Sequence, residues 1–321
     1  MATKRAPSPR YSSNLPAPNV ELQPDDLQLF WHLYCNRVMD AKSIYRLFPN
    51  RSQQKLSRRL NALRKEDAYI SRLPQANTRA ILRQGSDPLV YALSGGGAKA
   101  LAAERKISIP LTRWKSKNLA LTTNTIQHEI HASRFMAEVH RCAAMSGGDM
   151  SFHHSHEFMQ IEPTNRGLPN VLRTQINGWK GHRVTEGTAP DRIFSIVAGG
   201  RKQFFFVEMD EGTETIAPGT SKISQASFWR STSLLRKFAI YTSAFETKAH
   251  QACFDIPVFR VITVTTSRER IRNMQDSIKQ HLPNARNGLF LFTHREAVEG
   301  SDKGSIPLVF QDTETGSVAL I

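Results

Sequence analysis

Cysteine is scarce in this sequence, and its three residues, Cys35, Cys142 and Cys253, lie far apart. An odd and widely spaced set argues against a disulfide framework or a zinc knuckle and is typical of buried thiols in a reducing compartment. The sequence also lacks the apolar run of about 18 residues that a membrane-spanning helix needs, and it lacks a basic amphipathic anchor. Its first residues contain no apolar stretch of the kind found in signal peptides. We therefore expect a cytoplasmic protein with no membrane partner.

Acidic residues are few compared with basic ones: 28 Asp and Glu against 43 Lys and Arg give a formal net charge of +15 at pH 7. A charge of this size favours a polyanionic partner, most simply nucleic acid, and the alternative is a basic protein that binds no polyanion. The sequence has no GxxxxGK(S/T) phosphate loop. The glycine run at 95–97 lacks the strand and helix that frame a dinucleotide loop, so we interpret it as a linker.

The first part of the chain shows the element order of a winged helix-turn-helix domain. Residues 1–20 are rich in Pro, Ser, Ala and basic residues, which predicts a disordered basic tail. Residues 21–115 form the expected winged helix domain and its connector, with the change of domain between about 94 and 120. Three helices are predicted by DDLQLFWHLYCNR, DAKSIYRLF and RSQQKLSRRLNALRKE, and AYISRL and PLVYAL then predict a two-stranded hairpin.

The third predicted helix carries a buried stripe of Leu56, Leu60 and Leu63, spaced at i, i+4 and i+7. Its other faces place five polar residues in the major groove of DNA, namely Arg51, Gln54, Lys55, Arg58 and Arg59. Arg79 and Arg83 lie in the loop of the hairpin, where a wing meets the DNA backbone. The alternative is a structural three-helix bundle with a solvated basic face.

Residues 116–321 alternate between helices and strands, which predicts an α/β domain with a mixed sheet. A long helix is expected at TNTIQHEIHASRFMAEVHRCAAM, and a strand at HEFMQIEP, residues 156–163. Two further strands, RIFSIV and QFFFVEM, flank a Gly-Gly pair. The later elements are expected to be a helix from about 225 to 248, a strand at VFRVITVTT, a helix at SRERIRNMQDSIKQHL and a strand at GLFLFTH.

Three acids stand at the ends of the two strands that flank Gly199-Gly200. If this pair forms a two-residue turn, Asp191 lies opposite Glu208, and Asp210 returns to the same face of the sheet two residues later. Carboxylates crowded in this way repel one another unless a cation such as Mg²⁺, or Mn²⁺, neutralises them. The alternative is that they are the solvated ends of the hairpin, because a slip of one residue would separate the pair.

Several of these residues carry a resemblance to a known family. Asp191 preceded by Pro190, the strand hairpin, the segment VEMDEGTET and the later KFAIY resemble the replication-relaxation family of plasmid and mobile-element proteins. The resemblance extends from about residue 25 to 295. It implies an N-terminal winged helix joined to a domain related to the PD-(D/E)XK, restriction-endonuclease-like nuclease fold. It also implies that Asp191 and Glu208 are catalytic metal ligands, with Asp210 as a third.

The sequence departs from the nuclease pattern at one position. The pattern has Lys two residues after the acid, and here that position is Asp210. By the same resemblance Lys237, on a later helix, is the candidate that stabilises phosphate charge in its place. Lys237 lies at the edge of a buried helical stripe, so its side chain can reach back to the acids or extend to solvent.

The histidines of the second domain form no familiar zinc motif. His128 and His131 in HEIH are one residue closer than in the HExxH motif of zinc proteases. A zinc site together with the histidines of FHHSHEF, residues 152–158, is one interpretation, and solvated side chains are the other. Glu129 and Glu138 lie on the helix where the nuclease fold often places an additional acid.

Three classes of function follow. The first is a plasmid or mobile-element enzyme for DNA processing, a Mg²⁺-dependent DNA endonuclease or nickase that uses Asp191, Glu208, Asp210 and Lys237. The second is a catalytically silent replication initiator or regulator with the same fold. The third is a winged-helix transcriptional regulator whose second domain senses a ligand or forms a homodimer. All three bind double-stranded DNA, and the sequence leaves open whether the protein is an enzyme.

Overall fold

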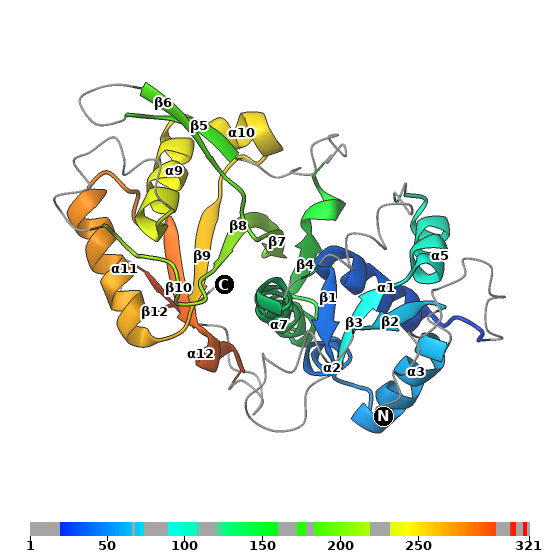
Figure 1. Cartoon of the computed structure of the whole chain (residues 1–321). Coiled ribbons are helices and arrows are strands. Elements are labelled where there is room, and N and C mark those ends of the chain that lie inside the picture. The colour runs from blue at the N-terminus through cyan, green and yellow to red at the C-terminus, as the bar shows by residue number, and fades with distance from the viewer. Residues whose placement is uncertain are drawn as a thin grey trace, which may run out of the picture. The chain divides into compact units, whose positions relative to one another are not determined.

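The structure, a computed structural model, is of mixed α/β class and divides into two compact units, Met1–Ile126 and Gln127–Ile321 (Figure 1). Each unit is described by itself. No helix in the described part of the chain is long and apolar enough to cross a membrane. The structure describes residues 20–65, 68–73, 89–107, 109, 121, 123–159, 172–177, 183–218, 232–299, 309–312 and 317–319.

The first unit contains four described helices and one antiparallel sheet of three strands. Its elements are α1 (Pro24–Asn36), β1 (Val38–Asp40), α2 (Ala41–Leu47), α3 (Gln53–Arg64), β2 (Ile70–Arg72), β3 (Val90–Leu93) and α5 (Gly95–Arg105). The strands lie in the order β1-β3-β2. The three helices and two strands that the sequence predicts are therefore present, and β1 is a strand that the sequence pattern did not reveal.

Two side chains cap the N-terminal ends of the helices α2 and α3. The Asp40 carboxylate accepts a hydrogen bond from the backbone N–H of Ser43 at 2.9 Å, and the Ser52 hydroxyl accepts one from the N–H of Lys55 at 3.3 Å. Both satisfy backbone donors that a helix leaves free at its start. In α3, Leu60 and Leu63 are buried. The apolar stripe of this helix therefore faces the core of the unit, as its spacing predicts.

The glycine run at 95–97 begins the helix α5 and is not a linker. A Cβ atom on Gly96 would lie 2.1 Å from the carbonyl oxygen of Ala68, and one on Gly97 would lie 2.2 Å from that of Tyr69. Only glycine allows such a close approach of two backbone segments. The following residues, AKALAAER, have high helix propensity. The interpretation of this segment as a linker is therefore wrong.

The second unit is built on a mixed sheet of seven strands in the order β12-β11-β10-β9-β8-β7-β4. β8 pairs parallel to β9 and β9 parallel to β10, while the other pairs are antiparallel. A separate two-stranded sheet pairs β5 (Leu172–Asn177) with β6 (Arg183–Thr188). The remaining elements are α7 (Thr123–Met145), β4 (Met150–His154), η2 (Ser155–Glu157), β7 (Arg192–Ala198), β8 (Arg201–Met209), α9 (Leu234–Glu246), α10 (Ala249–Phe254), β9 (Arg260–Thr265), α11 (Arg268–His281), β10 (Phe290–His294), α12 (Arg295–Glu299), β11 (Val309–Asp312) and β12 (Ser317–Ala319).

Helices cover both faces of this sheet, with α9 and α11 on one face and α7 on the other (Figure 1). Phe204 and Phe206 of β8 pack with the buried side chains of α9 and α11. Their neighbours Phe205 and Val207 pack with those of α7. Alternate residues of a strand point to opposite faces, so a strand covered on both sides is apolar throughout. This explains the continuous apolar run FFFV.

Three expectations differ from the structure or extend beyond the residues that it describes. Of the strand predicted at residues 156–163, His156 and Glu157 instead belong to the short helix η2, whose start is capped by the Glu157 carboxylate on the backbone N–H of His154. Residues 160–163 lie outside the described residues, and a strand that was not predicted lies at Met150–His154. The helix expected from 225 is described from Leu234, and residues 219–231 lie outside the described residues. Cys253 is exposed and Cys35 and Cys142 are half-buried, so the prediction of buried thiols is wrong.

The β7–β8 hairpin turns at Gly199 and Gly200, as the sequence predicts. Their φ angles are +53° and +73°. The register runs from Ala198 opposite Arg201 to Arg192 opposite Val207. Positive φ at both central residues is the requirement of a type I′ turn, whose twist matches that of the two strands.

Replacement of Gly199 tests this turn. A Cβ atom at Gly199 meets nothing within 4 Å, so the cost of a side chain there is backbone strain alone. We expect Gly199→Val to lower the free energy of unfolding by about 1–2 kcal/mol. Gly199→Asn is the control and should cost much less, since Asn tolerates positive φ. Urea denaturation measures both, and equal stability of the two variants would contradict the assignment.

Candidate functional site

The hairpin register places Asp191 and Glu208 at the same end of the sheet, directly beyond the last pair, Arg192 and Val207. Asp191 directly precedes β7, and its backbone N–H donates to the carbonyl of Val207 at 2.9 Å, the residue that already lies opposite Arg192. Ile193 and Phe206 belong to the core beneath α9. Residues two positions away share that face. Glu208 therefore belongs to the face of the sheet that α9 covers, and Asp191 stands at the end of the sheet, one residue before β7. The predicted register is confirmed as far as the pair of Arg192 and Val207.

Glu208 is a buried acid held by two side chains of α9. Lys237 Nζ donates to its Oε2 at 3.1 Å, and the Tyr241 hydroxyl donates to its Oε1. Lys237 and Tyr241 are four residues apart, so they lie on one face of the helix. Burial raises the pKa of Glu208 to about 7, against the opposing effect of the Lys237 ammonium.

Lys237 is the cation of this cluster. Its ammonium also lies 3.1 Å from Glu214 Oε2. Burial alone would lower the pKa of Lys237, but the two carboxylates beside it raise the pKa above its ordinary value. The side chain therefore reaches back to the acids and does not extend to solvent, which decides between the two orientations that the sequence allowed.

Asp191 is held by a backbone donor and a histidine. Its Oδ2 accepts a hydrogen bond from the N–H of Met209 at 2.7 Å, and its Oδ1 lies 3.0 Å from Nε2 of His128 on α7. Burial would raise the pKa of Asp191, but His128, the N–H of Met209 and the Lys237 ammonium together outweigh burial and lower the pKa. The hydrogen bond to Asp191 raises the pKa of His128. Both shifts favour a carboxylate beside an imidazolium.

Glu211 is a member of the site that the sequence analysis missed. Its carboxylate lies 3.0 Å from His131 Nδ1, and it accepts a hydrogen bond from Arg295 at 2.6 Å. These contacts keep the pKa of Glu211 below its ordinary value although burial opposes this. Of the two histidines of HEIH, His131 contacts Glu211, and His128 contacts Asp191 and also lies 3.8 Å from Glu211. The signal that could have found Glu211 is its place directly after Asp210.

Asp210 has partners of its own. Its carboxylate accepts hydrogen bonds from Arg270 of α11 at 2.5 and 2.9 Å and from the Thr265 hydroxyl at 2.5 Å. Burial would raise the pKa of Asp210, but the Arg270 guanidinium lowers it. The structure therefore joins Asp191, Glu208 and Lys237 in one cluster and ties Asp210 to α11 instead.

One comparison with known proteins identifies the family of the chain. The replication-relaxation family matches residues 30–253, which is more than half of the sequence. The chain belongs to this family. No curated protein and no solved structure matches it. The family's description links it to replication, and the match includes Asp191, Glu208 and Lys237 but not Arg270.

The two acids of α7, Glu129 and Glu138, are each paired with an arginine. Glu129 lies 2.5 Å from Arg192, and the fully buried Glu138 lies 2.5 Å from Arg141. Each acid therefore has a cation of its own beside it, and the contacts described for the Glu208 cluster do not include either acid.

The structure also bears on which metal ions the site can hold. Among the described residues, no group of three or more His, Cys, Asp or Glu is arranged to hold a metal ion. This argues against a zinc site at the histidines, of which His153 instead pairs with Glu157 at 3.1 Å. Mg²⁺ commonly uses one or two carboxylates and keeps several waters. Asp191 and Glu208 fit that smaller requirement, and Asp210 does not join them.

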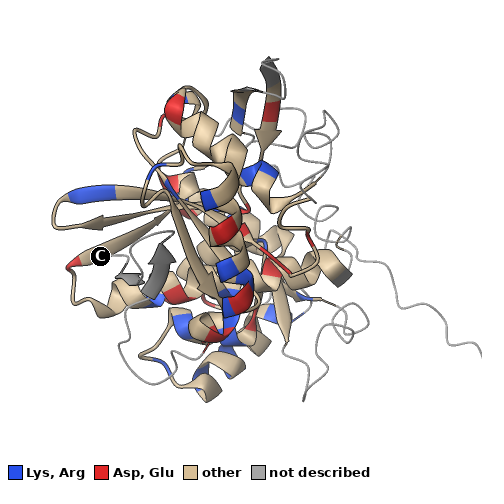
Figure 2. Ribbon diagram, turned by 90° about the vertical axis from the view of Figure 1, so that its left-hand side faces the viewer, with Lys and Arg blue, Asp and Glu red and all other residues tan. Residues whose placement is uncertain are grey.

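The predicted DNA-binding residues of α3 differ in their exposure. Gln54, Lys55 and Arg58 are exposed. Arg51, which precedes the helix, is also exposed and lies 2.5 Å from Asp25. Arg59 forms a salt bridge with Asp26, which is 2% exposed. Arg79 and Arg83 lie outside the described residues. Figure 2 shows basic and acidic segments interspersed along the ribbon.

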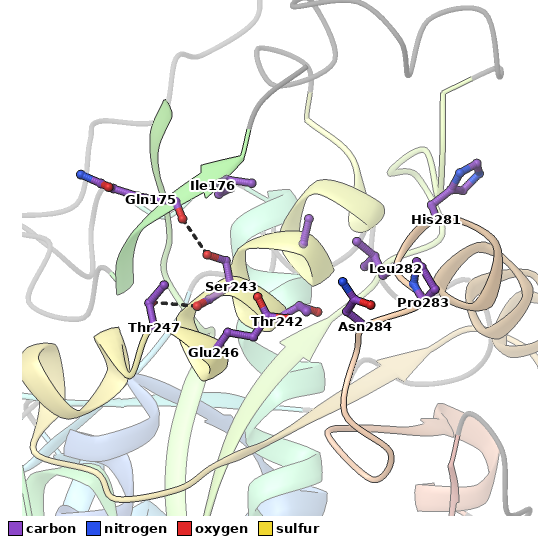
Figure 3. Close-up of a pocket in the computed structure, with 11 residues that line it drawn as sticks. Gln175, Ile176, Thr242, Ser243, Glu246, Thr247, His281, Leu282, Pro283 and Asn284 are labelled. Carbon is purple, nitrogen blue, oxygen red and sulfur yellow. Dashed lines mark hydrogen bonds between the residues drawn. The ribbon is translucent and has the colours of Figure 1, made fainter. Parts of the chain in front are cut away.

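A cavity of about 450 Å³ lies apart from the carboxylates (Figure 3). It is lined by residues of β5, of α9, and of the end of α11 and the segment after it, among them His281 and Asn284. In it the Ser243 hydroxyl donates to the carbonyl of Gln175 at 2.7 Å. No residue of the Asp191 cluster lines it, so concavity alone does not identify the candidate site in this unit.

The pKa of Glu208 gives a pH-dependent prediction. A carboxyl whose pKa rises from 4.5 to about 7 on folding stabilises the fold fully below pH 4.5, and this contribution is lost as the pH rises through 7. The variant Glu208→Gln lacks this pH-dependent contribution. We expect the parent's free energy of unfolding, relative to the variant's, to fall by roughly 2–3 kcal/mol across this window. Urea denaturation at several pH values with a chelator measures it, and a constant difference would contradict the raised pKa.

Proposed function

We propose that this protein binds double-stranded DNA through its first unit and hydrolyses a phosphodiester bond with a Mg²⁺-dependent site in its second unit. The observation that carries the proposal is the 3.1 Å contact between Lys237 Nζ and Glu208. It places a Lys beside the Glu although the strand itself has Asp210 where nucleases of this type have lysine, and Asp191 lies near enough to both to affect their pKa values. A plasmid or mobile-element role in replication or DNA processing agrees with the family.

The element order supports this proposal for both units. In the first unit, α2 and α3 followed by the strands β2 and β3 agree with a winged helix-turn-helix domain, in which α3 enters the major groove. In the second, an antiparallel hairpin continues into the parallel strands β9 and β10, with helices on both faces. This agrees with the mixed sheet expected of a restriction-endonuclease-like domain.

The roles of the three residues follow from their charges. Asp191 and Glu208 supply the oxygen ligands, and Tyr241 fixes the orientation of Glu208. A bound Mg²⁺ would supply an activated water and polarise the phosphate. Lys237 would offset the negative charge that develops on the phosphate, as positioned cations do in phosphoryl transfer.

One observation favours a second candidate, a DNA-binding protein without catalytic activity. Each carboxylate oxygen of Asp191 and Glu208 already accepts a hydrogen bond from the protein or lies within 3.0 Å of His128. Such a network can stabilise the acids without any cation. In this case the second unit is a scaffold of an initiator or regulator.

Plasmid nicking decides between the two candidates. We expect the parent to relax supercoiled plasmid with Mg²⁺ or Mn²⁺. Asp191→Asn, Glu208→Gln and Lys237→Ala should each reduce the rate by about 100-fold or more, because each removes charge that acts on the reacting phosphate. Lys279→Ala removes an exposed lysine of α11 and is the matched control. DNA binding without nicking in the parent would leave the silent candidate in place of the enzyme.

Duplex binding tests the role of α3. Arg58→Ala should weaken affinity for duplex DNA by about 1–3 kcal/mol if the side chain contacts a base, and the affinity of the parent should fall steeply with salt. The melting temperature of this variant should not change, since Arg58 is exposed. Arg59→Ala is the contrasting variant and should cost about 1–3 kcal/mol of stability, because it leaves Asp26 buried without its cation. Unchanged binding by Arg58→Ala would exclude α3 as the recognition helix.

A further inference from the structure

A second cavity of the second unit, about 510 Å³ in volume, lies at the turn end of the β7–β8 hairpin. We call it the hairpin-end pocket and define it by Arg201, Lys202, Arg260 and Arg286, which line it from three separate segments. Lys202 and Glu208 are six residues apart on β8, which corresponds to about 20 Å of strand. The pocket is therefore separate from the carboxylate cluster at the other end of the hairpin.

The lining of the hairpin-end pocket carries positive charge without negative charge. It contains the four cations and no Asp or Glu. Among the described residues, no salt bridge joins any of the four to a carboxylate. Cations gathered in one cavity repel one another, and a bound anion removes that repulsion. Lys237, Arg270 and Arg295 at the other end of the sheet each have acids beside them, so this pocket differs from the carboxylate cluster in its charge.

Aromatic rings support two of the cations in place of carboxylates. The Lys202 ammonium lies 4.7 Å from the ring centroid of Phe158 and 5.2 Å from that of Phe204. The Arg286 guanidinium lies 5.1 Å from the ring centroid of Phe245. An aromatic face orients a cation without cancelling its charge. The pocket thus combines fixed positive groups with flat apolar surface.

We infer that the hairpin-end pocket binds a nucleotide unit, with its phosphate on the cations and its base or sugar against the aromatic lining. Guanidinium groups match phosphate oxygens in pairs, and ring faces are the surfaces on which bases stack. The volume is in the range of small-molecule sites and exceeds the needs of an inorganic anion. The nucleotide can be free or part of a DNA strand. The second source rests on the proposed function, since it adds a contact for DNA beyond α3.

The test measures binding to the full-length protein in the presence of a chelator, so that the carboxylate cluster does not contribute. The probes are a fluorescent single-stranded oligodeoxynucleotide and a deoxynucleoside monophosphate as competitor. The double variant Arg260→Gln/Arg286→Gln should bind the oligonucleotide roughly ten-fold or more weakly, as expected for the loss of charge-assisted contacts. Lys202→Gln changes only an exposed end of the strand and tests the pocket should the double variant fail to fold. Arg272→Gln, on the exposed face of α11, is the matched control.

The outcomes separate this inference from the proposed function. Weaker oligonucleotide binding by the pocket variants, with duplex affinity still sensitive to Arg58→Ala, supports a strand in the pocket. Weaker binding of the monophosphate alone supports a free nucleotide as the occupant. If the pocket variants bind both probes as tightly as the parent and Arg272→Gln, the inference is overturned, whatever the nicking and duplex assays show. Loss of nicking or of duplex binding leaves this comparison unaffected.

Discussion

A slip of one residue in the pairing of β7 with β8 would turn Asp191 and Glu208 onto opposite faces of the sheet, because side chains alternate along a strand. The two-residue turn at Gly199-Gly200 fixes the pairing, and the apolar residues on both faces of β8 reinforce it. The same register decides which residues meet the helices. It brings Glu208 to α9 and leaves the hairpin-end pocket at the opposite end of the strands.

The site is a balance of buried charges. A buried carboxylate without a partner is costly, and it takes up a proton unless cations or donors stabilise its charged form. Glu208 has Lys237 and Tyr241 and still has a pKa raised to about 7, so its charge is the least stabilised of the group. Asp191 and Asp210 have pKa values below their ordinary ones, owing to His128 and Arg270. A divalent cation beside Glu208 would supply the missing stabilisation.

The sequence predicts well what depends on local pattern. The hairpin turn, its register, the long helix α7 and the strands β9 and β10 follow from glycine chemistry and apolar periodicity. Contacts between segments far apart in the chain do not. Nothing in the local pattern pairs Asp210 with Arg270, which is 60 residues away, or Arg59 with Asp26. The strand β4 was missed because its five residues, MSFHH, are too short and too polar to indicate a strand without their pairing with β7. The orientation of the Lys237 side chain depends on where α9 lies relative to β8, and the local sequence pattern does not give that position.

The central claim is that Asp191 and Glu208 together hold one divalent cation. Calorimetric titration of Mn²⁺ into the parent and into Asp191→Asn, at a pH above 7 where Glu208 is ionised, tests it most directly. The account predicts a single saturable site in the parent and none in the variant, while both remain folded. Equal binding by the two proteins, or no binding by the parent, would contradict it.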